Sequence, residues 1–178
     1  MAIYSSTVQP SVNDLYETPP ATLDMILDCL DPEKHYIWEP FKGSGHSTRY
    51  MQSRGFIVTN GDHEDFFQQA VPPNRIGNHL ERVLVSNPPF SIKRQILKRL
   101  SELGVHKVAL LLPAPVIFTK YFQAYCTNDN VLQLIIHTKR CSFLDPDTGQ
   151  PTKKTASFDI LWACTNLALD QDISFSKT

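Results

Sequence analysis

Residues 83–90 read Val-Leu-Val-Ser-Asn-Pro-Pro-Phe, an apolar run that ends in an amide side chain, two prolines and an aromatic ring. Each proline lacks a backbone N–H and has a fixed φ, so the strand predicted over 82–86 must stop at Asn87. In open α/β sheets, ligands bind where the strands end. The side-chain oxygen of Asn87 and the free carbonyl of Pro88 would form a pair of acceptors suited to a planar amino group. The ring of Phe90 could stack on the group that carries this amine.

A second informative stretch lies upstream. Residues 36–45 read Tyr-Ile-Trp-Glu-Pro-Phe-Lys-Gly-Ser-Gly, which predicts a short strand over 36–40 followed by a turn with two glycines. Glycine permits positive φ and lets the backbone approach a ligand closely. The turn leads into an amphipathic helix predicted over 46–54, with Gly55 at its end. A strand, a glycine-rich turn and a helix in this order are typical of a site for a nucleotide-like ligand.

The remaining pattern alternates between strands and helices. We expect the first helix to begin with Thr18 as its N-cap and a proline at its first position, because both residue types favour helix starts. Its apolar face consists of Leu23, Ile26, Leu27 and Leu30. Further strands are predicted over 56–60, 107–112, 131–138 and 158–165, and further helices from Ser91, as N-cap, to Gly104 and over 116–126. The stretch 62–82 leaves open whether a short third strand exists.

No helix is predicted between the last two strands. The sequence therefore predicts an α/β fold with a mostly parallel sheet and an antiparallel C-terminal hairpin strand. The length of 178 residues fits a single domain over 1–178. We expect residues 1–13 to form a flexible arm.

Three motifs resemble those of the S-adenosylmethionine-dependent N6-adenine methyltransferases of the NPPF, DNA-modifying type. In that family an acidic D/E-P-F-x-G-x-G-like turn holds the methyl donor, and an N/D-P-P-Y/F/W motif holds the target amine. Here the matching stretches are 39–45 (Glu-Pro-Phe-Lys-Gly-Ser-Gly), 87–90 (Asn-Pro-Pro-Phe) and 16–19 (Tyr-Glu-Thr-Pro), the last resembling an N-terminal Y-x-T-P motif. The resemblance spans roughly residues 13–165 and implies a class I, Rossmann-like methyltransferase fold.

The resemblance also implies roles for individual residues. Those expected to act in catalysis are Asn87, Pro88, Pro89 and Phe90. Those expected to bind the donor S-adenosyl-L-methionine are Tyr16, Thr18, Glu39, Phe41, Gly43, Gly45, Asp62, Asp65 and Phe66. Glu39 would either bind the ammonium end of the donor or order the turn, unless it is simply a solvated strand end. Thr18 has a purely structural alternative as a helix cap. Asp62 and Asp65 are closer in sequence than the corresponding acids of the family, so one of the two has an alternative interpretation as a surface residue.

Nucleic acid is the partner that the resemblance implies, with DNA preferred and RNA possible. Because the net charge is -1, such contacts must come from local patches of cationic side chains. The candidates are Lys93, Arg94, Lys139, Arg140, Lys153 and Lys154, the last four in a loop that resembles the family's target-side loop. The same loop is also consistent with a solvated hairpin connection. Without a separate target-recognition domain, a homodimer or a partner subunit could supply further contacts.

The composition limits the other function classes. The cysteines are Cys29, Cys126, Cys141 and Cys164. They are far apart and form no C-x-x-C pair, so we expect reduced thiols in an intracellular protein and no metal site. No signal peptide or membrane-spanning run is visible. An RNA adenine or protein glutamine N-methyltransferase remains an alternative, because each substrate presents a planar amino group. A non-catalytic methyltransferase-like subunit is a third possibility.

Overall fold

The computed structural model describes residues 14, 16–77, 79–126, 130–152 and 158–176. The expected arm at 1–13 and the candidate residues Lys153 and Lys154 lie outside these residues. The helices are α1 (Pro20–Leu27), α2 (His46–Ser53), α3 (Lys93–Glu102) and α4 (Lys120–Cys126), with short 3₁₀ turns η2 (Phe66–Gln68), η3 (Phe90–Ile92) and η4 (Ala114–Phe118). The strands are β1 (His35–Trp38), β2 (Val58–Thr59), β3 (Arg75–Ile76), β4 (Leu80–Ser86), β5 (Val108–Pro113), β6 (Leu132–Ile136), β7 (Ile160–Thr165) and β8 (Ile173–Phe175).

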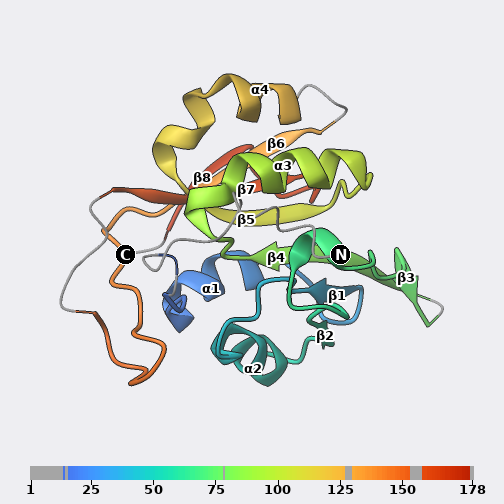
Figure 1. The fold of residues 1–178 in the computed structure, drawn as a ribbon, viewed down its shortest axis with the longest axis horizontal. Coiled ribbons are helices and arrows are strands. Elements are labelled where there is room, and N and C mark those ends of the chain that lie inside the picture. Colours follow the sequence, from blue (N-terminus) through green and yellow to red (C-terminus); the bar gives the residue numbers. More distant parts are fainter. Residues whose placement is uncertain (1–13, 15, 78, 127–129, 153–157, 177–178) are drawn as a thin grey trace.

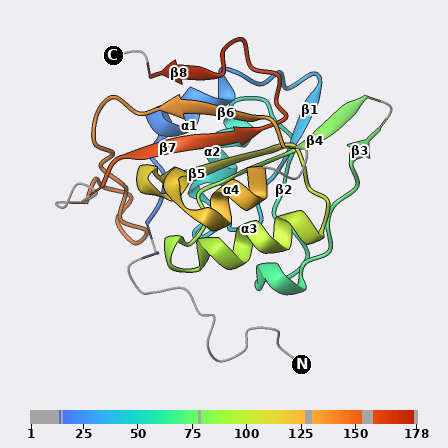
Figure 2. The same ribbon diagram turned by 90° about the horizontal axis from the view of Figure 1, so that it is seen from above.

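The described strands form one sheet in the order β2-β1-β4-β5-β7-β6-β8, with β3 attached to β4. β1 is parallel to β2 and to β4, and β4 is parallel to β5. β7 lies between β5 and β6 and is antiparallel to both. Figure 2 shows β8, β6, β7 and β5 side by side in this order. The predicted fold class is therefore confirmed: this is an α/β fold with a Rossmann-like sheet, mostly parallel with an antiparallel hairpin strand.

The structure adds one strand that the sequence prediction left open and one that it missed. The stretch 62–82 contains β3, but β3 pairs antiparallel with β4 and does not extend the sheet beyond β2. Pro72 and Pro73 precede it, separated from Arg75 only by Asn74, and since proline cannot donate to a strand ladder, pairing starts only at Arg75. β8 was not predicted, because its three residues are too few to show a period. It pairs in parallel with β6.

Helices cover both faces of the sheet. In Figure 1, α3 and α4 lie on one side of the strands and α1 and α2 on the other. Successive side chains of a strand point to opposite faces, and β4 shows this clearly. Val83 and Val85 pack in the core under α1 and α2, whereas Leu84 packs in the core under α3 and α4. A strand buried on both faces explains why residues 83–85 form a continuous apolar run.

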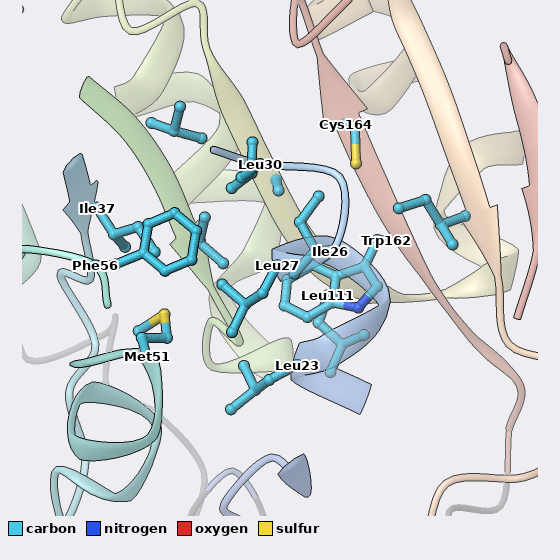
Figure 3. Close-up of a cluster of buried hydrophobic side chains, with 14 of the residues drawn as sticks. Leu23, Ile26, Leu27, Leu30, Ile37, Met51, Phe56, Leu111, Trp162 and Cys164 are labelled. Atoms are coloured by element: carbon cyan, nitrogen blue, oxygen red, sulfur yellow. The ribbon is translucent and has the colours of Figure 1, made fainter. Parts of the chain in front are cut away.

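Helix α1 is held against the sheet by its predicted apolar face. Leu23, Ile26, Leu27 and Leu30 are all buried. Figure 3 shows Ile26 and Leu27 next to the ring of Trp162 from β7. The indole N–H of Trp162 donates a hydrogen bond to the main-chain oxygen of Thr22 over 2.9 Å. This bond fixes the start of α1 above the sheet, and with it the segment that precedes the helix.

Three predicted helix starts are wrong in detail. The N-cap of α1 is Pro19, without a side-chain cap bond, so Thr18 is not the cap. Ser91 does not cap α3 either, because it lies within η3, where its hydroxyl donates to Asp14. The helix predicted over 116–126 is divided into η4 and α4, because Thr119 adopts an extended conformation between them. Among the described residues, no helix is long and apolar enough to cross a membrane.

The parallel strands bring the two informative motifs to the same edge of the sheet. Trp38 of β1 is in register with Leu84 of β4. The residues that follow these strands, Glu39 after β1 and Asn87 after β4, therefore lie at neighbouring positions of the carboxyl edge. This is the edge at which open α/β sheets bind ligands.

Candidate functional site

A cavity of about 610 Å³ opens at the carboxyl edge of β1 and β4. The expected site residues that line it are Tyr16, Thr18, Glu39, Phe41, Gly43, Asp62, Asn87 and Pro89. It is also lined by residues that the sequence analysis did not single out, among them Asp14, Glu17, Asn60 and His63. The volume is in the range of small-molecule and cofactor sites. The fold thus gathers the three motifs around one space.

The glycine turn after β1 forms one wall of the cavity. Gly43 and Gly45 have φ values of 52° and 82°, in the region that other residues rarely adopt. Gly45 is the N-cap of α2, and its N–H donates to the carbonyl of Lys42 over 2.8 Å. Gly45 does not line the cavity itself; it turns the chain so that Gly43 and its neighbours do.

Glu39 lies at the base of this wall and is only 2% exposed. Its Oε1 accepts a hydrogen bond from the N–H of Phe41 over 2.9 Å, and another from the hydroxyl of Ser86 at the end of β4. Burial raises the pKa of this carboxyl from 4.5 to about 8, and the neighbouring carboxyl of Glu17 adds to the rise. These contacts tie the ends of β1 and β4 together, which fits the interpretation that Glu39 orders the turn.

The loop after β2 forms the facing wall. Asp62 is exposed and lines the cavity, and its Oδ1 accepts a hydrogen bond from the N–H of Ala70 over 3.0 Å. Asp65 is buried and instead caps η2, because its Oδ1 accepts from the N–H of Phe67. Phe66 is in the core, 4.8 Å from the ring of Phe41 between ring centres. The structure therefore brings Asp62 to the cavity but not Asp65 or Phe66. These two residues instead hold the loop in place, Asp65 by capping η2 and Phe66 by packing in the core.

Gln69, which the sequence analysis missed, links these two walls. Its buried side-chain amide donates to the carbonyl of Pro40 over 2.9 Å and to the carbonyl of His63 over 2.7 Å. One carbonyl belongs to the glycine turn and the other to the loop after β2. Gln69 thus sets the spacing between the walls. No sequence pattern marks it, because a buried amide in a loop has no characteristic spacing.

The acceptor motif closes another side of the cavity. The Oδ1 of Asn87 is buried and has no hydrogen-bond partner among the described residues, and the same holds for the Oγ1 of Thr18. Buried polar atoms normally find a partner, so two unpaired oxygens at one cavity indicate a site for donors from a ligand. The amide N of Asn87 lies 3.5 Å from the carbonyl of Tyr16, a long contact.

Phe90 is packed among aromatic rings next to the cavity. Its ring contacts those of Phe143 and Phe158 edge to face, with centres 6.3 and 5.7 Å apart. Phe90 and Pro88 line a second small space of about 10 Å³, which has room for about one water. A base could stack on Phe90 only after Tyr16 or Phe143 moves aside. The expected stacking role of Phe90 therefore requires a rearrangement on this side of the site.

The segment before α1 contacts the acceptor motif. The carboxylate of Asp14 accepts hydrogen bonds from the N–H of Phe90 over 2.9 Å and from the hydroxyl of Ser91. The ring of Tyr16 stacks on Phe143, with centres 6.2 Å apart. A polar residue shortly before the Y-x-T-P motif is a weak signal, so Asp14 was not predicted as part of the site.

The cationic candidates occupy different positions around the site. Lys93 donates from its ammonium group to the carbonyl of Phe90 over 2.8 Å, so it stabilises the turn after the acceptor motif. Arg94, Lys139 and Arg140 are exposed. Arg140 lies 3.9 Å from the carboxylate of Asp159, a distance at which an exposed pair contributes little. Among the described residues, no cluster of His, Cys, Asp and Glu side chains has the arrangement of a metal site.

Comparison with known proteins finds two solved structures that are similar to this chain. One is the crystal structure of the 23S rRNA methyltransferase ErmE, with 11% sequence identity and a TM-score of 0.47, covering 84% of this chain and 69% of that chain. The other is a dimethyladenosine transferase from Plasmodium falciparum, with 13% identity and a TM-score of 0.46, covering 84% of this chain and 63% of that chain. No protein-family model and no curated protein sequence matches the chain. The fold class stated above rests on the strand order of this chain.

Proposed function

We propose that this protein is an S-adenosylmethionine-dependent methyltransferase that modifies the N6 amine of adenine in nucleic acid. One observation carries the proposal. The glycine turn and Asn87, whose side-chain oxygen has no hydrogen-bond partner among the described residues, line the same cavity at the carboxyl edge of the sheet. A donor held by the turn and an amine held by Asn87 would therefore meet in one space.

The cavity suits the proposed donor. Its volume of about 610 Å³ is within the range for cofactor sites. Asp62 at the wall after β2 would bind the ribose hydroxyls, as an acid at this position does in nucleotide-binding α/β folds. The turn with Gly43 would hold the amino-acid portion, with Phe41 beside it. The unpaired hydroxyl of Thr18 is a further polar group available to the donor.

The chemistry assigned to the acceptor motif needs no strong base. As the bond from nitrogen to the methyl group forms, the bond from sulfur to the methyl group breaks and S-adenosylhomocysteine leaves; the methylated nitrogen is then cationic and loses its proton readily to water. The donor, when bound, supplies a methyl group on a sulfonium. The Oδ1 of Asn87 and the carbonyl of Pro88 would each accept a hydrogen bond from one N–H of the amine, which favours a more tetrahedral and more nucleophilic nitrogen. Holding this nitrogen in line with the methyl group supplies much of the rate. Pro88 and Pro89 keep the turn rigid, because their φ angles are fixed.

Adenine in nucleic acid is the favoured substrate because the motifs resemble those of adenine enzymes, and DNA is preferred on the order of those motifs. RNA adenine and protein glutamine remain the alternatives, since both present a planar amine. A non-catalytic subunit is disfavoured by the open cavity and by Asn87, which lines it and whose side-chain oxygen has no partner among the described residues. Lys139, Arg140 and Arg94 are the exposed cations that would contact phosphates.

The experiment is methyl transfer from labelled S-adenosylmethionine to separate DNA, RNA and protein pools, followed by nucleoside or amino-acid analysis. We expect label in N6-methyladenine. Asn87→Ala should bind S-adenosylhomocysteine like the wild type but lose most of the transfer. Asn87→Asp, which keeps one acceptor oxygen, is the matched control and should retain more activity than Asn87→Ala. If the wild-type protein neither binds S-adenosylhomocysteine nor labels any pool, the proposal is wrong.

A further inference from the structure

One short segment connects the parts of the site. Residue Glu17 pairs its main chain with Leu144, donating its N–H over 3.0 Å and accepting the N–H of Leu144 over 2.8 Å. Its side chain reaches the glycine turn, where Oε1 accepts a hydrogen bond from the N–H of Ser44 over 2.8 Å. Glu17 is 8% exposed and lines the large cavity. A buried acid is thus placed directly at the turn proposed to hold the donor.

The position of Glu17 also accounts for Gly43. A Cβ atom built on Gly43 would lie 2.8 Å from Oε1 of Glu17, closer than such atoms normally approach. Any side chain at this position would push the carboxylate out of the turn. The space that glycine leaves at residue 43 is therefore filled by the carboxylate of Glu17, so the two residues form one structural unit.

Two acids near the turn could bind a positively charged group, and their surroundings differ. The Oε1 of Glu39 already accepts two hydrogen bonds, from Phe41 and Ser86, and burial raises the pKa of its carboxyl to about 8. Glu39 is thus mainly neutral at neutral pH before any ligand arrives. The Glu17 carboxylate accepts a single hydrogen bond from the described residues. Glu17 is accordingly the better placed of the two acids to accept from a cation in the cavity.

We propose that Glu17 binds the α-ammonium group of the donor's amino-acid portion, an inference that rests on the proposed methyltransferase function. The carboxylate keeps its bond from Ser44 and accepts a further one from the ammonium group. Glu39 then orders the turn and does not contact the ammonium group directly. Within the Tyr-Glu-Thr-Pro motif, the residue at the variable position becomes a donor-binding residue.

The test compares two ligands by calorimetry at neutral pH. S-adenosylhomocysteine carries the amino-acid portion, whereas 5′-methylthioadenosine shares the nucleoside and sulfur but lacks the ammonium group. Glu17→Gln keeps an oxygen for the Ser44 N–H and removes the charge. We expect it to weaken S-adenosylhomocysteine binding roughly 10- to 150-fold, the loss of one hydrogen bond to a charged group. Its affinity for 5′-methylthioadenosine should match that of the wild type, which also shows that the variant is folded.

Glu39→Gln is the matched control, because it resembles the neutral carboxyl that this residue presents at neutral pH. It should change the affinity for S-adenosylhomocysteine much less than Glu17→Gln does. If Glu17→Gln weakened the binding of both ligands equally, Glu17 would only support the turn. If it left S-adenosylhomocysteine binding unchanged or made it tighter, Glu17 would contribute nothing to the ammonium site. Either result overturns the inference. If the wild type binds neither ligand, the proposed function fails first, and the inference fails with it.

Discussion

The stability of the protein should fall as the pH rises towards 8, and a single residue, Glu39, should cause most of this change. Its carboxyl is 2% exposed and burial raises its pKa from 4.5 to about 8. The folded protein therefore holds this proton more tightly than the unfolded chain does. The stabilisation is complete below pH 4.5 and is lost progressively as the pH rises to about 8.

The magnitude follows from the two pKa values. Each pKa unit between the folded and unfolded states corresponds to about 1.4 kcal/mol. From 4.5 to about 8, the total is about 5 kcal/mol of unfolding free energy. Between about pH 6.5 and 8, it is about 2 kcal/mol. Burial lowers the pKa values of His35 and His137 from 6.5, so in the folded protein both titrate below this window.

The measurement is urea denaturation followed by tryptophan fluorescence at a series of pH values. Glu39→Gln removes the ionisation while keeping the shape and an acceptor oxygen. Its unfolding free energy should therefore be about 2 kcal/mol less dependent on pH across the window than that of the wild type. Glu33→Gln, at an exposed position, should follow the wild-type curve. Parallel pH profiles for the wild type and Glu39→Gln would refute the reasoning, because Glu39 would then be ionised at no cost in the folded state.

The remaining predictions concern donor binding and the core. Asp62→Ala should weaken S-adenosylhomocysteine binding by about 1.5–3 kcal/mol, the contribution of a charge-assisted hydrogen bond to the ribose. Asp62→Asn can still accept the hydrogen bond from the N–H of Ala70, so it separates the loss of the ribose contact from a change in the loop. An unchanged dissociation constant in calorimetry would exclude Asp62 from the ribose site. Trp162→Phe should lower the unfolding free energy by about 1–3 kcal/mol, because the buried carbonyl of Thr22 loses its donor. Denaturation at an unaltered midpoint would contradict the role given to this indole.

The local features of the fold could be predicted from the sequence where they have a short-range cause. The apolar runs at β4 and β5 are long enough to identify buried strands, and the prolines after Asn87 fix the end of β4. The apolar face of α1 follows from its spacing. The N-caps were harder, because Thr18 and Ser91 are suitable caps by type. Tertiary contacts decide the outcome instead: the hydroxyl of Ser91 donates to Asp14.

The candidate site was predictable only where a motif marks it. Most residues of the stretches 39–45 and 87–90 line one cavity, because parallel strands end at one edge of the sheet. Asp65 and Phe66 were predicted as donor-binding from a two-residue resemblance, but the loop turns them towards η2 and the core. Glu17 and Gln69 act through contacts with chain segments distant in sequence. Such contacts leave no periodic pattern, so only the folded arrangement reveals them.

The pairing of Glu17 with Leu144 has a consequence for how the site assembles. It is an isolated bridge between segments separated by most of the chain, so ordering it closes a long loop in return for few hydrogen bonds. Local structure of this kind opens well before the whole molecule unfolds. The amide protons of Glu17 and Leu144 should therefore exchange with solvent much faster than those of β4 and β5. Their exchange rates would report directly how often the segment before α1 separates from Leu144, independently of substrate and catalysis.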